Sequence, residues 1–287
     1  MDRLAIFWPM IALATVVFAV GAGWNVAVWL QGAVHGDPRL SAGRKLWLLL
    51  GDVAGVLFSR RLWLVVQATV LDALFHRRLQ QTSLLRWVAH ISLLISMGAL
   101  FALSLLTGFC QEILHGLFGV NHPLVLAIIN KDTPVMALAN EILGLVALPA
   151  LALVFYRRWG RREAQLLNAA PDLAILVLLA VILVTGYPLE SFRLLAENVP
   201  PSQAVYSFVG YPLALALRPL GWPWPTVHFW VFLLHAVLNA ALIAYLPFSK
   251  FWHVFASPLV AVANTLQEES PARPPVIVEE LLREGGR

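Results

Sequence analysis

Hydrophobic side chains are concentrated in five long stretches of the chain, which are separated by shorter polar or charged segments. A helix that crosses a bilayer needs about 20 mostly apolar residues, and each stretch is long enough. The stretches cover residues 5–30, 84–109, 135–156, 172–189 and 225–246. The pattern predicts an all-α, polytopic integral membrane protein built as a bundle of five transmembrane helices.

The segment at residues 46–79, between the first two spans, is apolar but carries scattered charges, and its apolar residues recur at helical spacing. A sixth span would place Asp72 or Arg60 in hydrocarbon, which is costly. We therefore expect helices that lie along the membrane surface. They would belong to a membrane domain of residues 1–263, followed by a soluble cytoplasmic tail at residues 264–287.

The composition supports this class, because 60% of the chain is hydrophobic and 13% is charged. Soluble domains are nearer half apolar and a quarter charged, so a soluble enzyme and a disordered chain are both excluded. Cys110 is the one cysteine. The chain alone therefore makes no internal disulfide and holds no iron-sulfur cluster, and without a CxxCH motif it attaches no haem covalently.

Basic residues are distributed unevenly between the two sides of the predicted bundle. Of 20 Lys and Arg, 16 lie between the first span and the start of the second, between the third and fourth spans, or after the fifth, and only Arg3, Lys131, Arg193 and Arg218 fall on the other side. Basic residues mark the cytoplasmic side, and five spans place the termini on opposite sides. We expect the amino terminus outside and the carboxyl terminus in the cytoplasm, in the inner (cytoplasmic) membrane, with no nucleic-acid partner.

Two histidines lie inside predicted spans: His90 near the start of the second and His235 in the middle of the fifth. Ionisable residues at such depth are scarce and usually functional. Both lie in the cytoplasmic half, so we expect them to be the two axial ligands of a haem b. Arg86, one turn before His90, would neutralise a propionate. The alternatives are hydrogen bonds between helices and, less well supported, a zinc site.

A second haem is a further option, so the sequence leaves one or two haems open. His228 is seven residues before His235 and lies on the same helix face, about 10.5 Å further out. Its partner would be His115 or His122, in the expected connection between the second and third spans, or Met97.

Polar residues near the outer ends of the spans are candidates for a quinone site, namely Lys131, Asp132, Glu141 and Glu190. Quinol oxidation releases protons and needs a polar acceptor near a haem edge. Lys131, just before the third span, and Glu141, one or two turns into it, are the two candidates that we carry forward.

The segment LLHAVLNAALIAYLPFSKFWHVFASPL resembles the last span of the gamma-subunit-like cytochromes b of respiratory nitrate reductase. In that family a ligand His is followed by Pro-Phe-Ser-Lys/Arg and then by a His and a Pro. The matching residues are His235, Pro247, Phe248, Ser249, Lys250, His253 and Pro258. RWVAHISLL fits the second-span ligand, and VTGYPLESFRL and LDALFHRRL are similar to membrane subunits of heterodisulfide-reductase-like and sulfite-reduction-associated complexes.

The resemblance implies a five-helix cytochrome b that exchanges electrons between membrane quinone and a cytoplasmic iron-sulfur subunit. Further membrane and periplasmic cytochrome subunits are additional partners that it implies, and it places a quinol-associated Lys near Lys131. Leu100 and Leu217 stand where the nitrate reductase pattern has the ligands of its outer haem. This departure favours the heterodisulfide-reductase-like branch over a nitrate reductase gamma subunit.

A membrane anchor or transporter without haem is the alternative from another class. A transporter is expected to show internal repeats or broken, charged helices in mid-span, and neither feature is recognised in the sequence.

Overall fold

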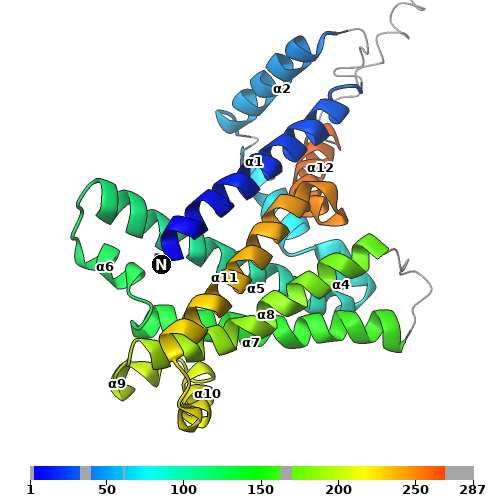
Figure 1. Cartoon of the computed structure of the whole chain (residues 1–287). Coiled ribbons are helices and arrows are strands. Elements are labelled where there is room, and N and C mark those ends of the chain that lie inside the picture. Colours follow the sequence, from blue (N-terminus) through cyan, green and yellow to red (C-terminus); the bar gives the residue numbers. More distant parts are fainter. Residues whose placement is uncertain (1–2, 33–39, 61, 162–169, 269–287) are drawn as a thin grey trace, which may run out of the picture. The chain divides into compact units, whose positions relative to one another are not determined.

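The computed structural model describes residues 3–32, 40–60, 62–161 and 170–268, and within these ranges it is helical without a strand (Figure 1). The elements are α1 (Arg3–Trp29), α2 (Ala42–Leu57), α3 (Leu62–Gln67), η1 (Ala68–Leu74), α4 (Arg77–Thr82), α5 (Leu84–Gly108), η2 (Phe109–Leu117), α6 (Pro123–Ile129), α7 (Pro134–Phe155), η3 (Tyr156–Gly160), α8 (Ala170–Ala196), α9 (Pro201–Ala204), α10 (Gly210–Leu217), η4 (Arg218–Leu220), α11 (Trp224–Tyr245), η5 (Leu246–Phe248), η6 (Lys250–Trp252) and α12 (His253–Glu268). The predicted all-α class is confirmed.

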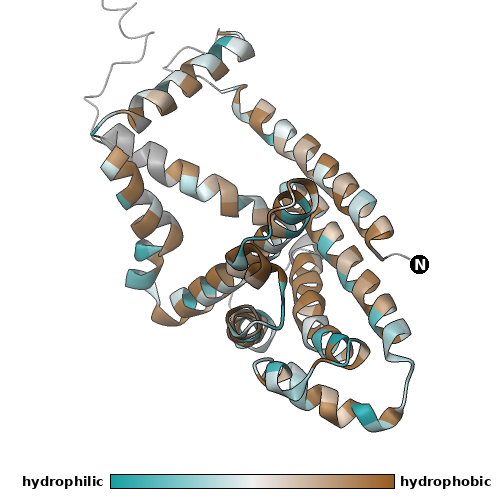
Figure 2. Ribbon diagram, turned by 90° about the vertical axis from the view of Figure 1, so that its left-hand side faces the viewer, coloured by the Kyte–Doolittle hydropathy of each residue, from teal (hydrophilic) through white to brown (hydrophobic). Residues whose placement is uncertain are grey.

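Within the described parts of the chain, five helical segments are long and apolar enough to cross a membrane, as the sequence predicted. They are Leu4–Trp29, Leu84–Leu117, Pro123–Gly160, Leu173–Ala196 and Trp224–Phe248. Their helices are coloured mostly brown in Figure 2, and large apolar side chains such as Leu13, Val20 and Trp230 are exposed along them. Helices that are apolar on every side need an apolar solvent, so the chain is a multi-pass membrane protein.

The second and third spans extend beyond their predicted ends, to 34 and 38 residues. The second continues from α5 into the π-helix η2, past Gln111 and Glu112. Hydropathy predicts an end at the first polar side chains. The backbone bonds of a helix do not depend on side-chain polarity, so the helix runs on.

One compact unit combines the first turns of α1, up to Ala12, with residues Ser83–Ile243. Within it α5 packs on α7, α7 on α8, and α8 on α10. Gly144 permits the close approach of α7 and α8, because a Cβ atom there would lie 2.9 Å from the hydroxyl of Tyr187. On α1, the ring of Phe7 lies 5.8 Å from that of Phe232 on α11.

The second unit contains the rest of α1, the short helices α2, α3, η1 and α4, and the segment from Ala244. Here α12 packs on η1 and α3, and Asn25 of α1 donates to the Pro247 carbonyl over 2.8 Å. The ammonium of Lys45 donates to the carbonyls of Leu30 and Gly32 at 3.0 and 2.8 Å, which satisfies acceptors at the end of α1.

The apolar segment at residues 46–79 forms short helices, of which α2 is the longest at 16 residues. None of its described helices is among the five candidate spans. Residues 269–287 of the predicted tail lie outside the described residues, whereas the tail's first residues continue α12.

Candidate functional site

His235 lies in the middle of α11 and is held by a neighbouring helix. Its Nδ1 is 2.9 Å from the Oγ1 of Thr185 on α8. In an imidazole ring Nε2 lies on the side away from Nδ1, so this contact directs Nε2 away from α8. Metal-binding histidines usually donate their other ring N–H to a neighbouring acceptor. The half-buried imidazole of His235, anchored through Nδ1 with Nε2 directed away from α8, therefore fits the role of an axial haem ligand.

The residues beside His235 are small or are bonded within α11. Ala236 and Ala240 are buried, and the Nδ2 of Asn239 donates to the His235 carbonyl over 2.8 Å. Small residues let neighbouring segments approach the helix closely. The ring of His235 is thus bonded to Thr185 of α8, whereas Asn239 bonds only the His235 backbone.

His90 lies in the second turn of α5 and is half-buried beside Ala89, which is 2% exposed. Ser83 begins this helix by accepting a hydrogen bond from the Arg86 backbone N–H at 3.4 Å. Residues four apart share one face of a helix, so Arg86 and His90 lie on the same face, as the sequence predicted.

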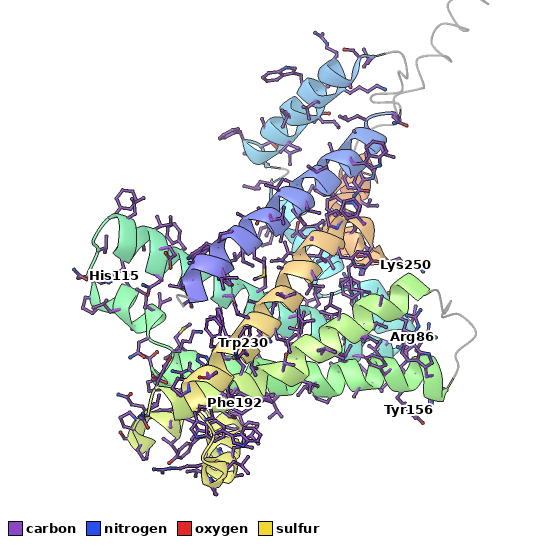
Figure 3. The ribbon with its side chains drawn as sticks, viewed as in Figure 1. Arg86, His115, Tyr156, Phe192, Trp230 and Lys250 are labelled. Atoms are coloured by element: carbon purple, nitrogen blue, oxygen red, sulfur yellow. The ribbon has the colours of Figure 1, made fainter. Side chains whose placement is uncertain are left out.

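The candidates for a second haem lie in different surroundings. His228 is 6% exposed, and its ring is 6.3 Å from that of Phe232, one turn further on. His115 lies on η2 and not in the connection where the sequence placed it. Its Nδ1 is buried without a hydrogen-bond partner. Figure 3 shows His115 and Arg86 at opposite ends of the continuous α5 and η2 helix.

His122 is the N-cap of α6, and its Nδ1 accepts the Leu124 backbone N–H over 3.3 Å. An acceptor Nδ1 requires the proton to be on Nε2 in the neutral ring. Met97 is half-buried within α5. Of the proposed partners for His228, His115 is therefore the one with an unused buried nitrogen.

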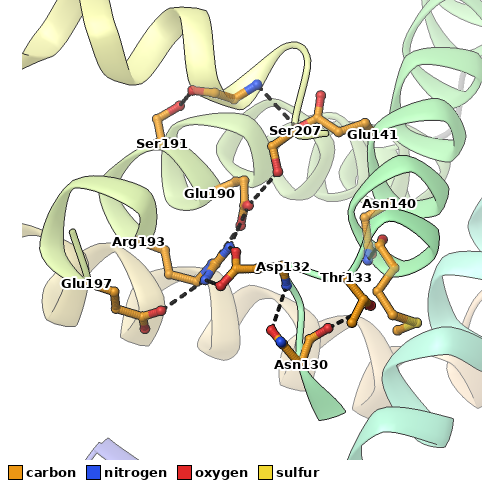
Figure 4. A network of polar contacts seen from close by, with 12 residues as sticks. Asn130, Asp132, Thr133, Asn140, Glu141, Glu190, Ser191, Arg193, Glu197 and Ser207 are labelled. Atoms are coloured by element: carbon orange, nitrogen blue, oxygen red, sulfur yellow. Dashed lines mark hydrogen bonds and ion pairs between the residues drawn. The ribbon is translucent and has the colours of Figure 1, made fainter. Parts of the chain in front are cut away.

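A network of charged side chains surrounds Arg193 near the carboxyl end of α8 (Figure 4). The guanidinium bonds Asp132 at 2.5 Å, Glu190 at 2.9 and 3.0 Å, and Glu197 at 2.9 Å. Ser207 donates to Glu190 over 2.9 Å. The network joins the turn before α7 to α8 and to the loop before α10. Arg193 is only 6% exposed, so it anchors these three segments.

Glu141 lies on α7 and is 3% exposed. Its carboxylate accepts the backbone N–H groups of Val209 and Gly210 at 2.8 and 3.2 Å, which are orphan donors at the start of α10. Tyr187 of α8 donates to the Glu141 carbonyl over 2.9 Å. Glu141 thus ties α7 to α8 and α10, and its carboxylate is committed to backbone donors.

Lys131 is exposed in the turn between α6 and α7. Its ammonium interacts electrostatically with Glu190 and with His235.

Three residues of this region, Thr185, Tyr187 and Arg193, were not predicted as functional or connecting residues. Thr185 is a polar residue that follows an apolar run (AILVLLAVILVT). That isolated polarity is the only signal in the sequence that points to it.

Among the described residues, five apolar spans, two of which carry histidines, define a multi-pass membrane protein. The nitrate reductase gamma subunit family matches residues 115–267, which is more than half of the chain, and the chain therefore belongs to this family.

The individual relatives that match this chain are named as oxidoreductases or as subunits of oxidoreductases. The E subunit of the dihydromethanophenazine:CoB–CoM heterodisulfide reductase of Methanosarcina mazei is 25% identical over 266 residues, covering 88% of this chain and 90% of that protein. Its counterpart of the same name in Methanosarcina acetivorans is 26% identical, with 88% of each chain covered. An EtfAB:quinone oxidoreductase of Syntrophomonas wolfei is 27% identical over 42% of this chain and 18% of its own length. No solved structure matches. The similarity supports a membrane subunit of a redox complex.

Proposed function

We propose that this protein is the haem b-containing membrane subunit of a respiratory redox complex. It would transfer electrons between membrane quinone or quinol and a cytoplasmic iron-sulfur subunit, in a complex of the heterodisulfide-reductase-like or sulfite-reduction-associated type. The observation that carries the proposal is the imidazole of His235, fixed through Nδ1 within an apolar span. The names of the heterodisulfide reductase relatives support it.

His90 and His235 would hold the haem through their imidazole nitrogens, and Arg86 would pair with a propionate. The bound group would supply one-electron transfer. Thr185 and the small residues of α11 would hold His235 in place. His228 with His115 is the arrangement that we favour for a second haem, because the Nδ1 of His122 is used in capping α6.

The quinone site would lie near Lys131, at the turn before α7. Lys131 is exposed and directly precedes Asp132 of the Arg193 network, so its ammonium would bind a quinone oxygen at the outer end of the spans. Glu141 would contribute indirectly by holding α10, because its carboxylate is occupied by two backbone N–H groups.

The partner would dock on the cytoplasmic side, in the inner membrane, with the amino terminus outside and the carboxyl terminus inside. The membrane domain would span residues 1–263, with α2, α3 and α4 on the membrane surface and a soluble tail at residues 264–287. Cys110 alone holds no cluster, so in this proposal the partner would supply the iron-sulfur centres. Further membrane and periplasmic cytochrome subunits would complete the complex.

Substitution of the two proposed ligands tests the haem assignment. His90→Ala and His235→Ala should each abolish the same low-spin haem b signal in a reduced-minus-oxidised spectrum of the purified chain. His76→Asn is the matched control. His76 has a φ of 47°, a conformation that Asn tolerates, and its replacement should leave the signal intact.

Survival of the low-spin signal in either ligand variant would contradict the pairing of His90 with His235. A wild-type chain without any haem b band would reject the whole proposal and would favour an anchor or a transporter.

A nitrate reductase gamma subunit is the second candidate, because the matching family carries that description. Leu100 and Leu217, in place of the expected outer-haem ligands, speak against it. Identification of the soluble protein that co-purifies with the chain separates the two candidates. A nitrate-reducing partner would favour the second.

A further inference from the structure

Thr185 lies in α8 with its hydroxyl placed between its own helix and the ring of His235. Its Oγ1 is 2.7 Å from the Val181 carbonyl oxygen and 3.1 Å from that of Ile182. The same oxygen is 2.9 Å from the Nδ1 of His235. One hydroxyl thus contacts two backbone acceptors and one imidazole nitrogen.

The protons in this contact can be counted. A threonine hydroxyl has one proton and two acceptor lone pairs. The carbonyl oxygens of Val181 and Ile182 can only accept, and the Val181 oxygen makes the shortest of the three contacts, so we assign the hydroxyl proton to it. The hydroxyl oxygen then faces His235 as an acceptor, and Nδ1 must carry the donated proton. In a neutral ring this leaves the lone pair on Nε2.

We propose that Thr185 is a positioning residue that holds His235 as the Nδ1–H tautomer and presents Nε2 as the metal-binding nitrogen. This inference rests on the proposed function, in which His235 is an axial ligand. Helix α8 contains no histidine and supplies no haem ligand. In this proposal it controls the orientation and tautomer of the ligand on α11.

The hydrogen bond has a consequence for the redox potential. A ring that donates its Nδ1 proton is a more basic ligand, and a more basic ligand stabilises ferric over ferrous iron. Without the Thr185 acceptor, the midpoint potential of the His235-ligated haem should rise. Outer-shell partners typically change metal affinity by about 10- to 100-fold. A tenfold loss in affinity for the ferric form alone corresponds to about 59 mV for a one-electron couple.

Potentiometric titration of the purified chain, combined with electron paramagnetic resonance of the ferric low-spin signal, tests the proposal. Thr185→Val retains the size and β-branching but removes the acceptor, and Thr185→Ala removes the acceptor without adding a methyl group. Both should raise the midpoint potential and shift the ferric signal. Thr185→Ser restores the hydroxyl and should return both to the wild-type values.

Ser104→Ala is the matched control. The Ser104 hydroxyl of α5 makes the same kind of bond, 3.0 Å from the Leu100 carbonyl, but on an exposed position. Its removal should not change the potential.

Three results would overturn the proposal. Unchanged potentials in Thr185→Val and Thr185→Ala would show that the hydroxyl does not act on the ligand. Equal shifts in Thr185→Ser and Thr185→Val would indicate a packing effect without a role for the hydrogen bond. A wild-type chain without haem would reject the proposed function itself, which is distinct from a haem that is present but insensitive to Thr185.

Discussion

Lys131 and Glu141 differ in their surroundings, although the sequence placed both at the outer start of the third span. Glu141 is buried and its carboxylate is bonded to two backbone N–H groups. A buried carboxylate that satisfies backbone donors stabilises the fold, since each unsatisfied donor would cost about 1–3 kcal/mol. Lys131 is exposed, so a ligand can reach it. At the residue scale, Lys131 is the better candidate for direct contact with quinone.

Lys131→Ala should weaken the interaction with quinol without changing the haem spectrum. A hydrogen bond to a charged group contributes about 1.5–3 kcal/mol, which predicts a rise of about ten- to a hundredfold in the apparent KM for a soluble quinol analogue. The measurement is the rate of haem reduction by that analogue in stopped flow.

Arg218→Ala is the control for the loss of a positive charge, because Arg218 is another exposed basic residue of the same unit. Its kinetics should match the wild type. Wild-type kinetics in Lys131→Ala would remove Lys131 from the proposed site.

At the scale of elements, α7 and α8 approach closely where Gly144 faces Tyr187. The Tyr187 hydroxyl donates to the Glu141 carbonyl over 2.9 Å, so the ring is fixed above the glycine. This packing sets the position of α8, which carries both Thr185 and Arg193. The glycine in α7 thus contributes to the geometry on both sides of the candidate site.

Gly144→Ala should destabilise the protein, because the added Cβ atom would come within 2.9 Å of the Tyr187 hydroxyl and 3.2 Å of its ring. Overpacking of this kind costs about 1–3 kcal/mol. The measurement is the thermal unfolding midpoint of the detergent-solubilised chain.

Gly98→Ala provides the comparison, since Gly98 is also in a spanning helix but a Cβ atom there would meet nothing within 4 Å. Alanine favours a helix over glycine by about 1 kcal/mol, so this variant should be as stable as the wild type or more so. Equal unfolding midpoints for Gly144→Ala and the wild type would refute the close-packing argument.

At the scale of the whole molecule, the apolar helices and the basic segments between them predict one orientation in the membrane. Five spans are present among the described residues, and an odd number places the two ends of the bundle on opposite sides. Most of the 20 Lys and Arg lie in the segments that we assign to the cytoplasm. An iron-sulfur partner on that side would meet a basic surface.

Reporter fusions test this orientation. Alkaline phosphatase, which is active only outside the cytoplasm, should be active when it is inserted after Val120, between the second and third spans. It should be inactive when it is fused to Arg287, where green fluorescent protein should fluoresce. The reverse pattern would invert the topology and would place the partner on the other side.

The sequence predicted the number of spans but not the full extent of the second and third, because side-chain polarity determines which segments enter lipid but not where a helix ends. It predicted the shared face of Arg86 and His90, since spacing within one helix determines which residues align. The extension of the second span through η2 was missed. Polar residues end a hydropathy pattern without ending the helix.

The sequence by itself determined that this is a five-span membrane protein with histidines in two spans, a family motif after His235 and a strong charge asymmetry. These properties belong to single helices and to their order along the chain. Only the tertiary structure decided that Thr185 meets His235 across two helices, that Glu141 holds the start of α10, and that Arg193 gathers three carboxylates. Each of these contacts depends on the rotation and crossing of separate helices, which hydrophobic periodicity in a uniformly apolar span does not specify.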